Sequence, residues 1–202
     1  MPLAWCGTDA KLKNFVVMSD DDNGSNTSAS SPSVKAIDLE SCTRPGEHPI
    51  KFTPSTCPPE FVPTLKAHVK GSQQIPFHPT EPTFDVWSLG MIAFLLVTKT
   101  PYFPKSNVNF EYLTNCLAAL RQEDIDNDPR LKRIKRSHGS DNQDDSIIDV
   151  DPLAKDFIVS CLRVDPTERP TIDDLMNHPF IAANNGKVDA GRNESSSYIS
   201  EN

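Results

Sequence analysis

The side chain whose chemistry most needs an explanation in this 202-residue chain is Asp85. It stands at the beginning of a segment, Phe84 to Val97, that is apolar on nearly every helical face, which predicts a helix in the centre of a fold. The segment has roughly half of the ~20 residues that a membrane-spanning helix needs. A buried carboxylate without hydrogen-bond partners costs several kcal/mol. We therefore expect Asp85 to bind another part of the chain.

Other acidic residues gather in polar segments that have little to bury. The first, residues 19–33, contains a run of Asp that is reminiscent of a calcium-binding loop. An EF-hand loop in this register would need acidic residues at Ser19 and Ser30, so we expect a solvated insertion instead. The second insertion spans residues 126–149, and its basic run is more typical of a surface loop than of a nuclear-import signal. Residues 183–202 are predicted to be a disordered polar tail.

The composition of the chain bears on its binding partners, on how much of it forms core and on its location. The net charge of −8 argues against nucleic acid or an anionic membrane as the main partner. Apolar residues make up 37% of the chain, below the ~45–50% of an average globular domain, so part of the chain is not expected to form core. The five cysteines include no C-x-x-C pair, which favours reduced thiols and a location in the cytoplasm or the nucleus.

Between the polar segments, the pattern of apolar residues predicts a mainly helical chain with a small β element. Phe15–Met18 and Val34–Ile37 are short apolar runs typical of a hairpin. The proline-rich segment Thr53–Pro63 is expected to be extended or turning. Apolar spacing and capping residues predict four helices, at residues 84–98, where Pro101 ends the helix, and at Asn109–Glu123, Asp151–Leu162 and Thr171–Met176.

Motifs in the second half of the chain resemble a known family. Residues 85–90 read D-V-W-S-L-G, which resembles the D-x-W-S-x-G motif of protein kinases. Residues 165–170 read D-P-T-E-R-P and residues 178–180 read H-P-F, and these resemble the family's D-P-x-x-R-P and H-P-F motifs. Each motif alone is moderately specific, and their order and spacing make the resemblance strong.

Upstream segments match earlier kinase motifs in the right order. Residues 9–14 read D-A-K-L-K-N, which matches the D-x-K-x-x-N of the catalytic loop. Asp38, in I-D-L-E, stands where the family has D-F-G, while residues 53–56 resemble its T-P-x-x substrate loop and residues 58–60 its A-P-E. The resemblance implies a mainly α fold: a partial kinase domain over residues 1–182, formed by the C-terminal helical lobe with a small β element.

The resemblance implies a role for each matching residue. Asp9 would accept the proton of a substrate hydroxyl, and Lys11 would neutralise the transferred phosphoryl group, as in serine/threonine kinases. Asn14 and Asp38 would hold the magnesium ions that bridge the phosphates of ATP. Magnesium binds few protein oxygens, which suits two ligands from separate loops. Thr53 would tie the substrate loop to Asp9.

Three further residues have structural roles by the same resemblance. Glu60 and Arg169 match a buried ion pair of the family, and Asp85 matches a carboxylate that binds the backbone of the catalytic loop. These residues support the fold rather than catalysis. Taken alone, Asp38 is more typical of an ordinary turn residue at the end of a strand, and the pattern at residues 9–14 arises easily by chance. Their order ahead of the stronger motifs favours the kinase assignment.

The chain departs from the family in four places, one of which is a loop between Asn14 and Asp38 that is longer than the family usually has. Gly7-Thr8 replaces the His-Arg before the catalytic aspartate, which removes the usual cation for an activation-loop phosphate. Glu40 replaces the flexible glycine of D-F-G. The chain has no Gly-rich phosphate loop and no V-A-I-K lysine ahead of the catalytic loop. We expect a truncated kinase fold whose ATP-covering lobe is encoded upstream, so that this chain alone is inactive.

Two functions remain open at this point. The full-length protein would be a protein serine/threonine kinase that uses ATP and magnesium to phosphorylate protein hydroxyls. Alternatively, the chain would be a pseudokinase-like module that binds protein partners without catalysis. Gly7-Thr8, Glu40 and the missing ATP-covering lobe favour this alternative. Both functions imply a protein substrate or partner, and neither nucleic acid nor a membrane.

Overall fold

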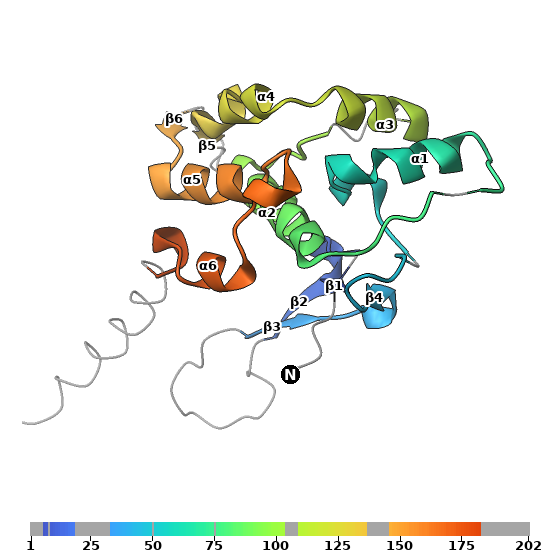
Figure 1. Ribbon diagram of the computed structural model, residues 1–202. Coiled ribbons are helices and arrows are strands. Elements are labelled where there is room, and N and C mark those ends of the chain that lie inside the picture. The colour runs from blue at the N-terminus through green and yellow to red at the C-terminus, as the bar shows by residue number, and fades with distance from the viewer. Residues whose placement is uncertain are drawn as a thin grey trace, which may run out of the picture.

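The computed structural model describes residues 6–7, 9–18, 33–49, 51–74, 76–103, 109–136 and 146–182. The insertion predicted at residues 19–33, apart from Ser33, and the tail predicted at residues 183–202 lie outside the described residues. Within them, helices surround one central helix, and the strands form two-stranded antiparallel pairs (Figure 1).

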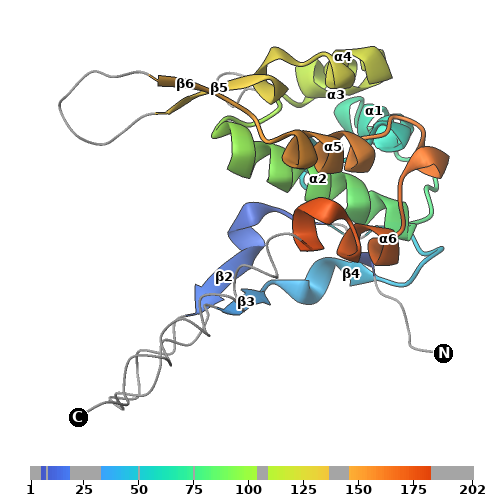
Figure 2. The same ribbon diagram turned by 90° about the vertical axis from the view of Figure 1, so that its left-hand side faces the viewer.

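The central helix, α2, spans Pro82–Thr98 and confirms the helix predicted from the apolar segment. Its first residue is proline, which suits the first turn because the N–H that proline lacks has no partner there. Trp87 and Phe94 on this helix are completely buried. In both views α2 lies between α3 and α4 on one side and the strands β2 and β3 on the other (Figures 1 and 2). The helix therefore forms the post around which the remaining elements pack.

The helix ends at residue 98, as predicted, three residues before Pro101. Thr98 is the last helical residue, and Lys99 takes left-handed backbone with a φ of 59°. The N–H of Lys99 bonds to the carbonyl oxygen of Leu95, which closes the last turn. The helix thus ends through the conformation of Lys99, before the proline is reached.

Helix α5, Pro152–Cys161, packs directly against α2 at Gly90. A Cβ atom at Gly90 would lie 2.7 Å from the Cβ of Cys161 and 2.8 Å from Cδ2 of Leu162, so the two helices approach more closely than any larger residue allows. The predicted capping of α5 is confirmed, because the Asp151 side chain accepts a hydrogen bond from the backbone of the first turn.

The proline-rich segment turns and leads into an additional helix. Two 3-10 turns, η4 (Pro54–Thr56) and η5 (Pro59–Phe61), each begin with a proline. Helix α1, Val62–Val69, follows directly. Phe61 is fully buried, and its ring meets that of Phe84 edge-on with 5.6 Å between centroids. The turns therefore anchor the substrate-loop segment to the beginning of α2.

The helix predicted at Asn109–Glu123 is two helices, α3 (Phe110–Ala119) and α4 (Gln122–Asp126). Arg121 takes extended backbone between them, and its N–H donates to the Asp124 carboxylate at 2.9 Å. This side-chain cap gives a backbone N–H at the beginning of α4 a hydrogen-bond partner. It therefore competes with the continuation of α3 through residue 121. Apolar spacing alone could not reveal the break.

The polar segment at residues 126–149 is not simply a surface loop. It contains η6 (Pro129–Leu131) and an antiparallel pair of strands, β5 (Arg133–Arg136) and β6 (Ser146–Asp149). Leu131 is 1% exposed and belongs to the main apolar core. The polar composition of the segment gave no indication that Leu131 is part of the core.

The predicted hairpin is present. β2 (Phe15–Met18) pairs antiparallel with β3 (Ser33–Ala36), and all of its side chains are exposed. A second pair joins β1 (Cys6–Gly7) to β4 (Cys42–Thr43). β1 also contacts α2, so this pair connects the strands to the helical core.

The last helix, α6 (Ile172–Met176), is confirmed together with its predicted cap. Thr171 and Asp174 form a capping box, in which each side chain bonds to the other residue's backbone N–H. The remaining short 3-10 turns are η1 (Leu12–Asn14), η3 (Leu39–Ser41) and η7 (Pro166–Glu168).

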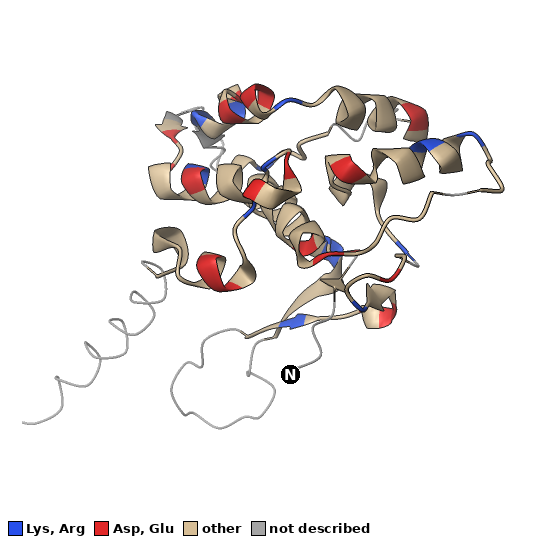
Figure 3. Ribbon diagram, in the orientation of Figure 1, with Lys and Arg blue, Asp and Glu red and all other residues tan. Residues whose placement is uncertain are grey.

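The described surface carries both signs of charge. Acidic and basic segments alternate over the helices in Figure 3, and α4 alone carries several acidic residues beside Arg121. All five cysteines are free thiols. Among the described residues, no helix has the length and apolar character to span a membrane.

Candidate active site

Three of the residues predicted to act on a substrate hydroxyl lie together. The Lys11 ammonium donates to Oδ2 of Asp9 at 2.6 Å and to Oγ1 of Thr53 at 3.2 Å. The Thr53 hydroxyl donates to the other carboxylate oxygen of Asp9, Oδ1. Asp9 is only 6% exposed. This buried carboxylate thus has a cation and a hydroxyl as partners, which offset the cost of removing it from water.

Asn14 holds the loop around Asp9 in place. Its side-chain nitrogen donates to the backbone carbonyl of Asp9 at 3.0 Å, in a buried hydrogen bond. The amide oxygen, which can only accept, takes no part in this bond. The carbonyl of Asn14 accepts a hydrogen bond from the N–H of Ile37 at 2.8 Å. This bond ties the loop to the residue directly before Asp38.

The two predicted metal ligands line one small cavity. Its volume is about 100 Å³, and its lining includes Asp9, Asn14 and Asp38. Asp38 is exposed and takes left-handed backbone, with φ 59° and ψ 49°. Aspartate is among the few residues that tolerate this conformation. The structure therefore brings a carboxylate and a side-chain amide together from two separate loops.

Lys51 contacts the turn that follows Asp38 and is a residue that the sequence motifs did not reveal. Its ammonium donates a hydrogen bond to the Glu40 carboxylate. This bond raises the pKa of Lys51, and the charges of Asp38 and Asp9 raise it further. The same bond lowers the pKa of Glu40. Glu40 could have indicated this lysine from the sequence. It places a carboxylate where the family motif has glycine, and a carboxylate favours a cation nearby.

Asp85 contacts the loop that carries Asp9. Its Oδ2 atom accepts a hydrogen bond from the N–H of Gly7 at 2.9 Å. Its Oδ1 atom is buried and has no hydrogen-bond partner among the described residues. Burial raises the pKa of Asp85 to about 6, and the bond from Gly7 opposes this only in part. The first turn of α2 therefore fixes the backbone just before Asp9 through one carboxylate oxygen.

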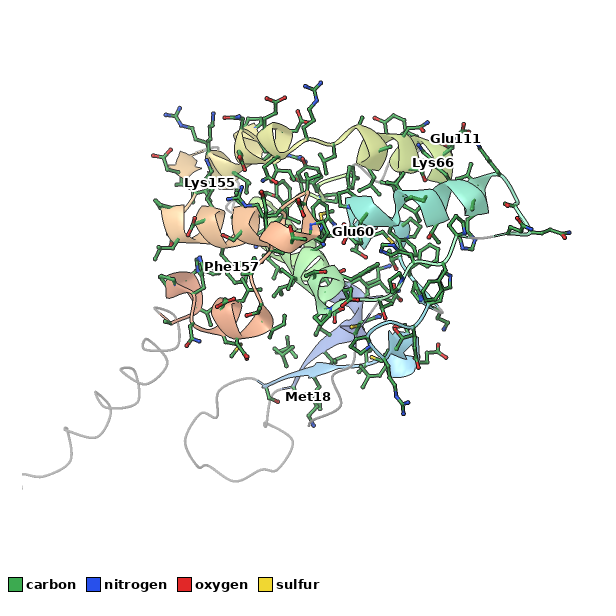
Figure 4. All side chains as sticks on the ribbon, viewed as in Figure 1. Met18, Glu60, Lys66, Glu111, Lys155 and Phe157 are labelled. Atoms are coloured by element: carbon green, nitrogen blue, oxygen red, sulfur yellow. The ribbon has the colours of Figure 1, made fainter. Side chains whose placement is uncertain are left out.

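Glu60 and Arg169 form a two-pronged ion pair. Both terminal nitrogens of Arg169 donate to the Glu60 carboxylate, each at 2.7 Å. The arginine side chain is fully buried and also donates to the carbonyl oxygens of Thr83 and Arg163. Its guanidinium lies 5.1 Å from the centre of the Trp87 ring. Glu60 is half-buried and lies toward the middle of the view in Figure 4, whereas Met18 lies at the outer end of the hairpin.

A larger cavity of about 460 Å³ borders the Asp9 cluster. Lys11 and Thr53 contribute polar groups to its wall. The opposite wall is apolar and comes from α2 and the segment after it, with Met91, Ile92, Leu95, Tyr102 and Phe103. The candidate site therefore continues from the charged cluster into an apolar pocket.

Arg130 secures the apolar wall, and the sequence motifs missed it as well. Its guanidinium forms a two-pronged pair with Asp128 at 2.9 and 2.6 Å. It also donates to the carbonyl oxygens of Pro101 at 3.1 Å and Tyr102 at 3.2 Å. The signal was the Asp-Pro pair at residues 128–129, which is the same cap pattern that correctly marked the beginning of α5.

The chain is similar in sequence to protein kinases. A family model described as "Protein kinase domain" matches residues 8–181. The chain is 30% identical over 108 residues to mitogen-activated protein kinase 10 of Oryza sativa subsp. japonica, which covers 50% of this chain and 18% of that protein. It is 32% identical over 102 residues to the probable serine/threonine-protein kinase CCRP1 of Zea mays, covering 50% and 13%.

A longer match extends over more of the chain. MAP kinase-activated protein kinase 5 of Homo sapiens is 28% identical over 136 residues, which covers 65% of this chain and 26% of that protein. The chain therefore spans about a quarter or less of the length of these curated relatives. The family model covers most of the chain and all the residues of the polar cluster, and the fold is accordingly protein-kinase-like. The chain belongs to the protein kinase domain family.

Proposed function

We propose that this chain forms the substrate-binding and metal-binding part of a protein serine/threonine kinase domain. In the full-length protein, that domain transfers a phosphoryl group from ATP to a serine or threonine hydroxyl of a protein. The observation that carries the proposal is the contact of Asp9 with both Lys11 and Thr53. A carboxylate, a cation and the substrate loop are here held in one place, and phosphoryl transfer depends on such positioning.

In the proposed reaction, Asp9 orients the substrate hydroxyl and accepts its proton. The bonds of Asp9 to Lys11 and Thr53 hold the carboxylate in one orientation. Lys11 places a positive charge beside the reacting hydroxyl and stabilises the negative charge of the transferred phosphoryl group. Thr53 fixes the substrate loop to the same carboxylate, so the loop and the base keep a constant spacing.

The oxygens around the small cavity fit magnesium. Asp38 offers a carboxylate and Asn14 its amide oxygen, and magnesium favours a few protein oxygens beside water and phosphate. The described part of the chain has no group of three or more His, Cys, Asp or Glu side chains that could hold a metal ion. A site of one carboxylate and one amide needs no such group. When bound, magnesium-ATP would supply the phosphoryl group and the positive charge that offsets its phosphates.

We propose further that the ATP-covering lobe is encoded upstream of this chain. The chain spans about a quarter or less of the relatives described above, and the kinase motifs that it carries begin with the catalytic loop. Sequencing the transcript upstream of Met1 tests this proposal. Coding sequence for a Gly-rich loop and a V-A-I-K lysine is the expected result, and an in-frame stop codon without either would contradict it.

The catalytic proposal is tested with a protein that includes the upstream coding sequence. Transfer of labelled phosphate to a protein substrate should fall by about 10²–10⁴-fold in Asp9→Asn, because the base is lost. Glu111→Gln, which changes an exposed carboxylate on α3, is the matched control and should retain activity. Full activity of Asp9→Asn, or no activity in a folded protein with both lobes, would overturn the proposal.

A second candidate function is a module that binds protein partners without catalysis. Glu40 favours it, because a charged residue bound to Lys51 replaces a glycine that gives kinases a mobile loop. The two functions differ in their response to nucleotide. A protein with both lobes should melt at a higher temperature with magnesium-ATP if it is a kinase, and Asp38→Ala should abolish the shift. A binding module would show no shift in either form.

We also propose that the partners are proteins and that the chain acts in the cytoplasm or the nucleus. The net charge of −8 opposes nucleic acid and anionic membranes as partners. The five free thiols support a reducing compartment. Fluorescence microscopy of a tagged full-length protein tests the location directly.

A further inference from the structure

The proposed reaction makes no use of the apolar pocket beside the Asp9 cluster. The volume of this pocket is about 460 Å³, within the ~300–1,000 Å³ that is usual for ligand sites. Lys11 and Thr53 line the pocket and also bond to Asp9, so it begins one side chain away from the carboxylate that would orient the acceptor hydroxyl. A peptide whose hydroxyl reaches Asp9 would therefore pass this pocket.

The charged side chains on the wall of the pocket are positive. The described residues that line it include Lys11 and Lys13, and no aspartate or glutamate. Lys11 already has Asp9 as an ion-pair partner at 2.6 Å. Lys13 is exposed at the end of the turn η1 and has no hydrogen-bond or ion-pair partner among the described residues. Its ammonium is therefore available to a carboxylate from another molecule.

The opposite wall offers a preformed apolar surface. Ile92 and Leu95 belong to one face of α2, and both line the pocket. The ring of Tyr102 meets that of Phe94 edge-on with 5.1 Å between centroids, and Arg130 bonds to the carbonyl oxygen of Tyr102. Because these contacts already fix the wall, an apolar side chain could enter the pocket without a rearrangement of the protein.

We propose that this pocket binds a segment of the protein substrate that carries an apolar side chain and, close to it, an aspartate or glutamate. The apolar side chain enters the pocket against Leu95 and Tyr102, and the carboxylate pairs with Lys13. A substrate lysine or arginine in the same place would meet like charge. This inference rests on the proposed function, because it names the class of substrate that the kinase would phosphorylate.

The test uses the protein with its upstream coding sequence and a set of serine peptides. Each position around the serine is replaced in turn by Glu, Lys, Leu or Gln, and the readout is the ratio of kcat/KM between two peptides, which cancels any general loss of activity. At one position Glu should be favoured over Lys by about two- to fivefold, the range for exposed ion pairs. At a nearby position Leu should be favoured over Gln by about fivefold, through partial burial of one leucine side chain.

Two variants assign these preferences to the pocket. Lys13→Glu should reverse the charge preference, so that Lys is favoured over Glu at the same peptide position. Leu95→Gln should lower the preference for Leu to less than about twofold, because it makes the pocket wall polar. The matched controls are Lys66→Glu, at an exposed lysine of α1 (Figure 4), and Leu96→Gln, at an exposed leucine of α2 that does not line the pocket. Both controls should leave the two preferences unchanged.

Three results would overturn the proposal. The first is selection for Lys over Glu by the natural sequence, and the second is an unchanged preference in both Lys13→Glu and Leu95→Gln. The third is phosphorylation without preference at any position, which is the result expected if another part of the full-length protein fills the pocket. Each of these results leaves the kinase function intact, because the peptides are still phosphorylated.

Peptide binding separates this inference from a failure of the proposed function. If none of the peptides is phosphorylated, the kinase function fails, and fluorescence anisotropy with the same peptide set then decides the pocket. Tighter binding of the Glu and Leu peptides, with the charge preference reversed in Lys13→Glu, would support a site for an acidic and apolar segment of a protein partner. Equal binding of all peptides would refute both the kinase function and the pocket inference.

Discussion

The helical part of the molecule and the segment that carries the candidate site are held together in different ways. Around α2, large side chains such as Trp87 and Phe94 are completely buried and contact one another through apolar surface. Around Asp9, the contacts are hydrogen bonds and ion pairs between residues far apart in the chain. The hairpin β2–β3 beside the site is exposed along its whole length.

This difference has a physical consequence for function. The geometry of an apolar core is held by many close contacts, and removing atoms from it leaves a void. The geometry of a polar cluster depends on a few specific partners. The site can therefore lose its geometry through a single substitution while the helical part stays folded. Substitutions of residues where the two parts meet should affect both the stability of the helical part and the geometry of the site. Such substitutions test the comparison most strongly.

The largest effect is expected where a charged pair lies inside the helical part. Arg169→Met should destabilise the chain by about 3–5 kcal/mol, because Glu60 is left without its buried partner. Urea unfolding followed by circular dichroism measures this loss. The double variant with Glu60→Gln should recover part of the stability, since no charge remains stranded. A loss below ~1 kcal/mol in the single variant would mean that the pair is not truly buried.

A smaller, pH-dependent effect is expected from Asp85, which connects the helical part to the site. Its pKa is about 6 in the folded chain against an ordinary value of 3.8, so the folded state holds the proton more tightly. The stabilisation is fully present below about pH 4 and is lost as the pH rises through 6. The full change corresponds to about 3 kcal/mol.

Comparison with Asp85→Asn isolates this contribution. The difference in unfolding free energy between the natural chain and this variant should fall by up to about 3 kcal/mol from pH 4 to pH 7. Urea unfolding at a series of pH values measures it. A difference that stays constant across this range would show that the buried carboxylate does not titrate as the geometry requires.

The smallest effects are expected from a glycine-to-alanine substitution made once in the helical core and once beside the site. Gly90→Ala should cost about 1–3 kcal/mol, because its Cβ would lie only 2.7 Å from Cys161. Gly7→Ala should change stability by less than about 0.5 kcal/mol, because its Cβ would lie at an ordinary 3.6 Å from Asp85. Thermal unfolding of both variants provides the measurement. Equal losses would contradict the difference in packing between core and site.

Much of the fold could be predicted from local signals in the sequence. The apolar run of α2, the Asp-Pro cap of α5 and the Thr171 capping box each specify a helix from a few neighbouring residues. The break after α3 could not be predicted in this way, because a side-chain cap by Asp124 competes there with an uninterrupted apolar stripe. The buried Leu131 was concealed by its polar neighbours.

The candidate site was predictable only where it matches motifs. Resemblance placed Asp9, Asn14 and Asp38 on the metal and catalytic side, and the structure gathers these residues around one cavity. Lys51 and Arg130 belong to no motif, and Glu40 and the backbone of Pro101, which they contact, lie 11 and 29 positions away in the chain. A charged residue of this kind can be recognised from sequence only when the position of its partner is already known.

Arg130 has a consequence for how this molecule could diversify. One arginine, fixed by Asp128 in its own turn, holds the backbone of Pro101 and Tyr102 from 29 and 28 positions away. The shape of the apolar pocket is therefore set by a segment that contributes nothing to the Asp9 cluster. Substitutions near residue 130 can reshape the pocket while the side chains of the Asp9 cluster stay where they are. The shape of the apolar pocket and the arrangement of the polar cluster can thus change independently.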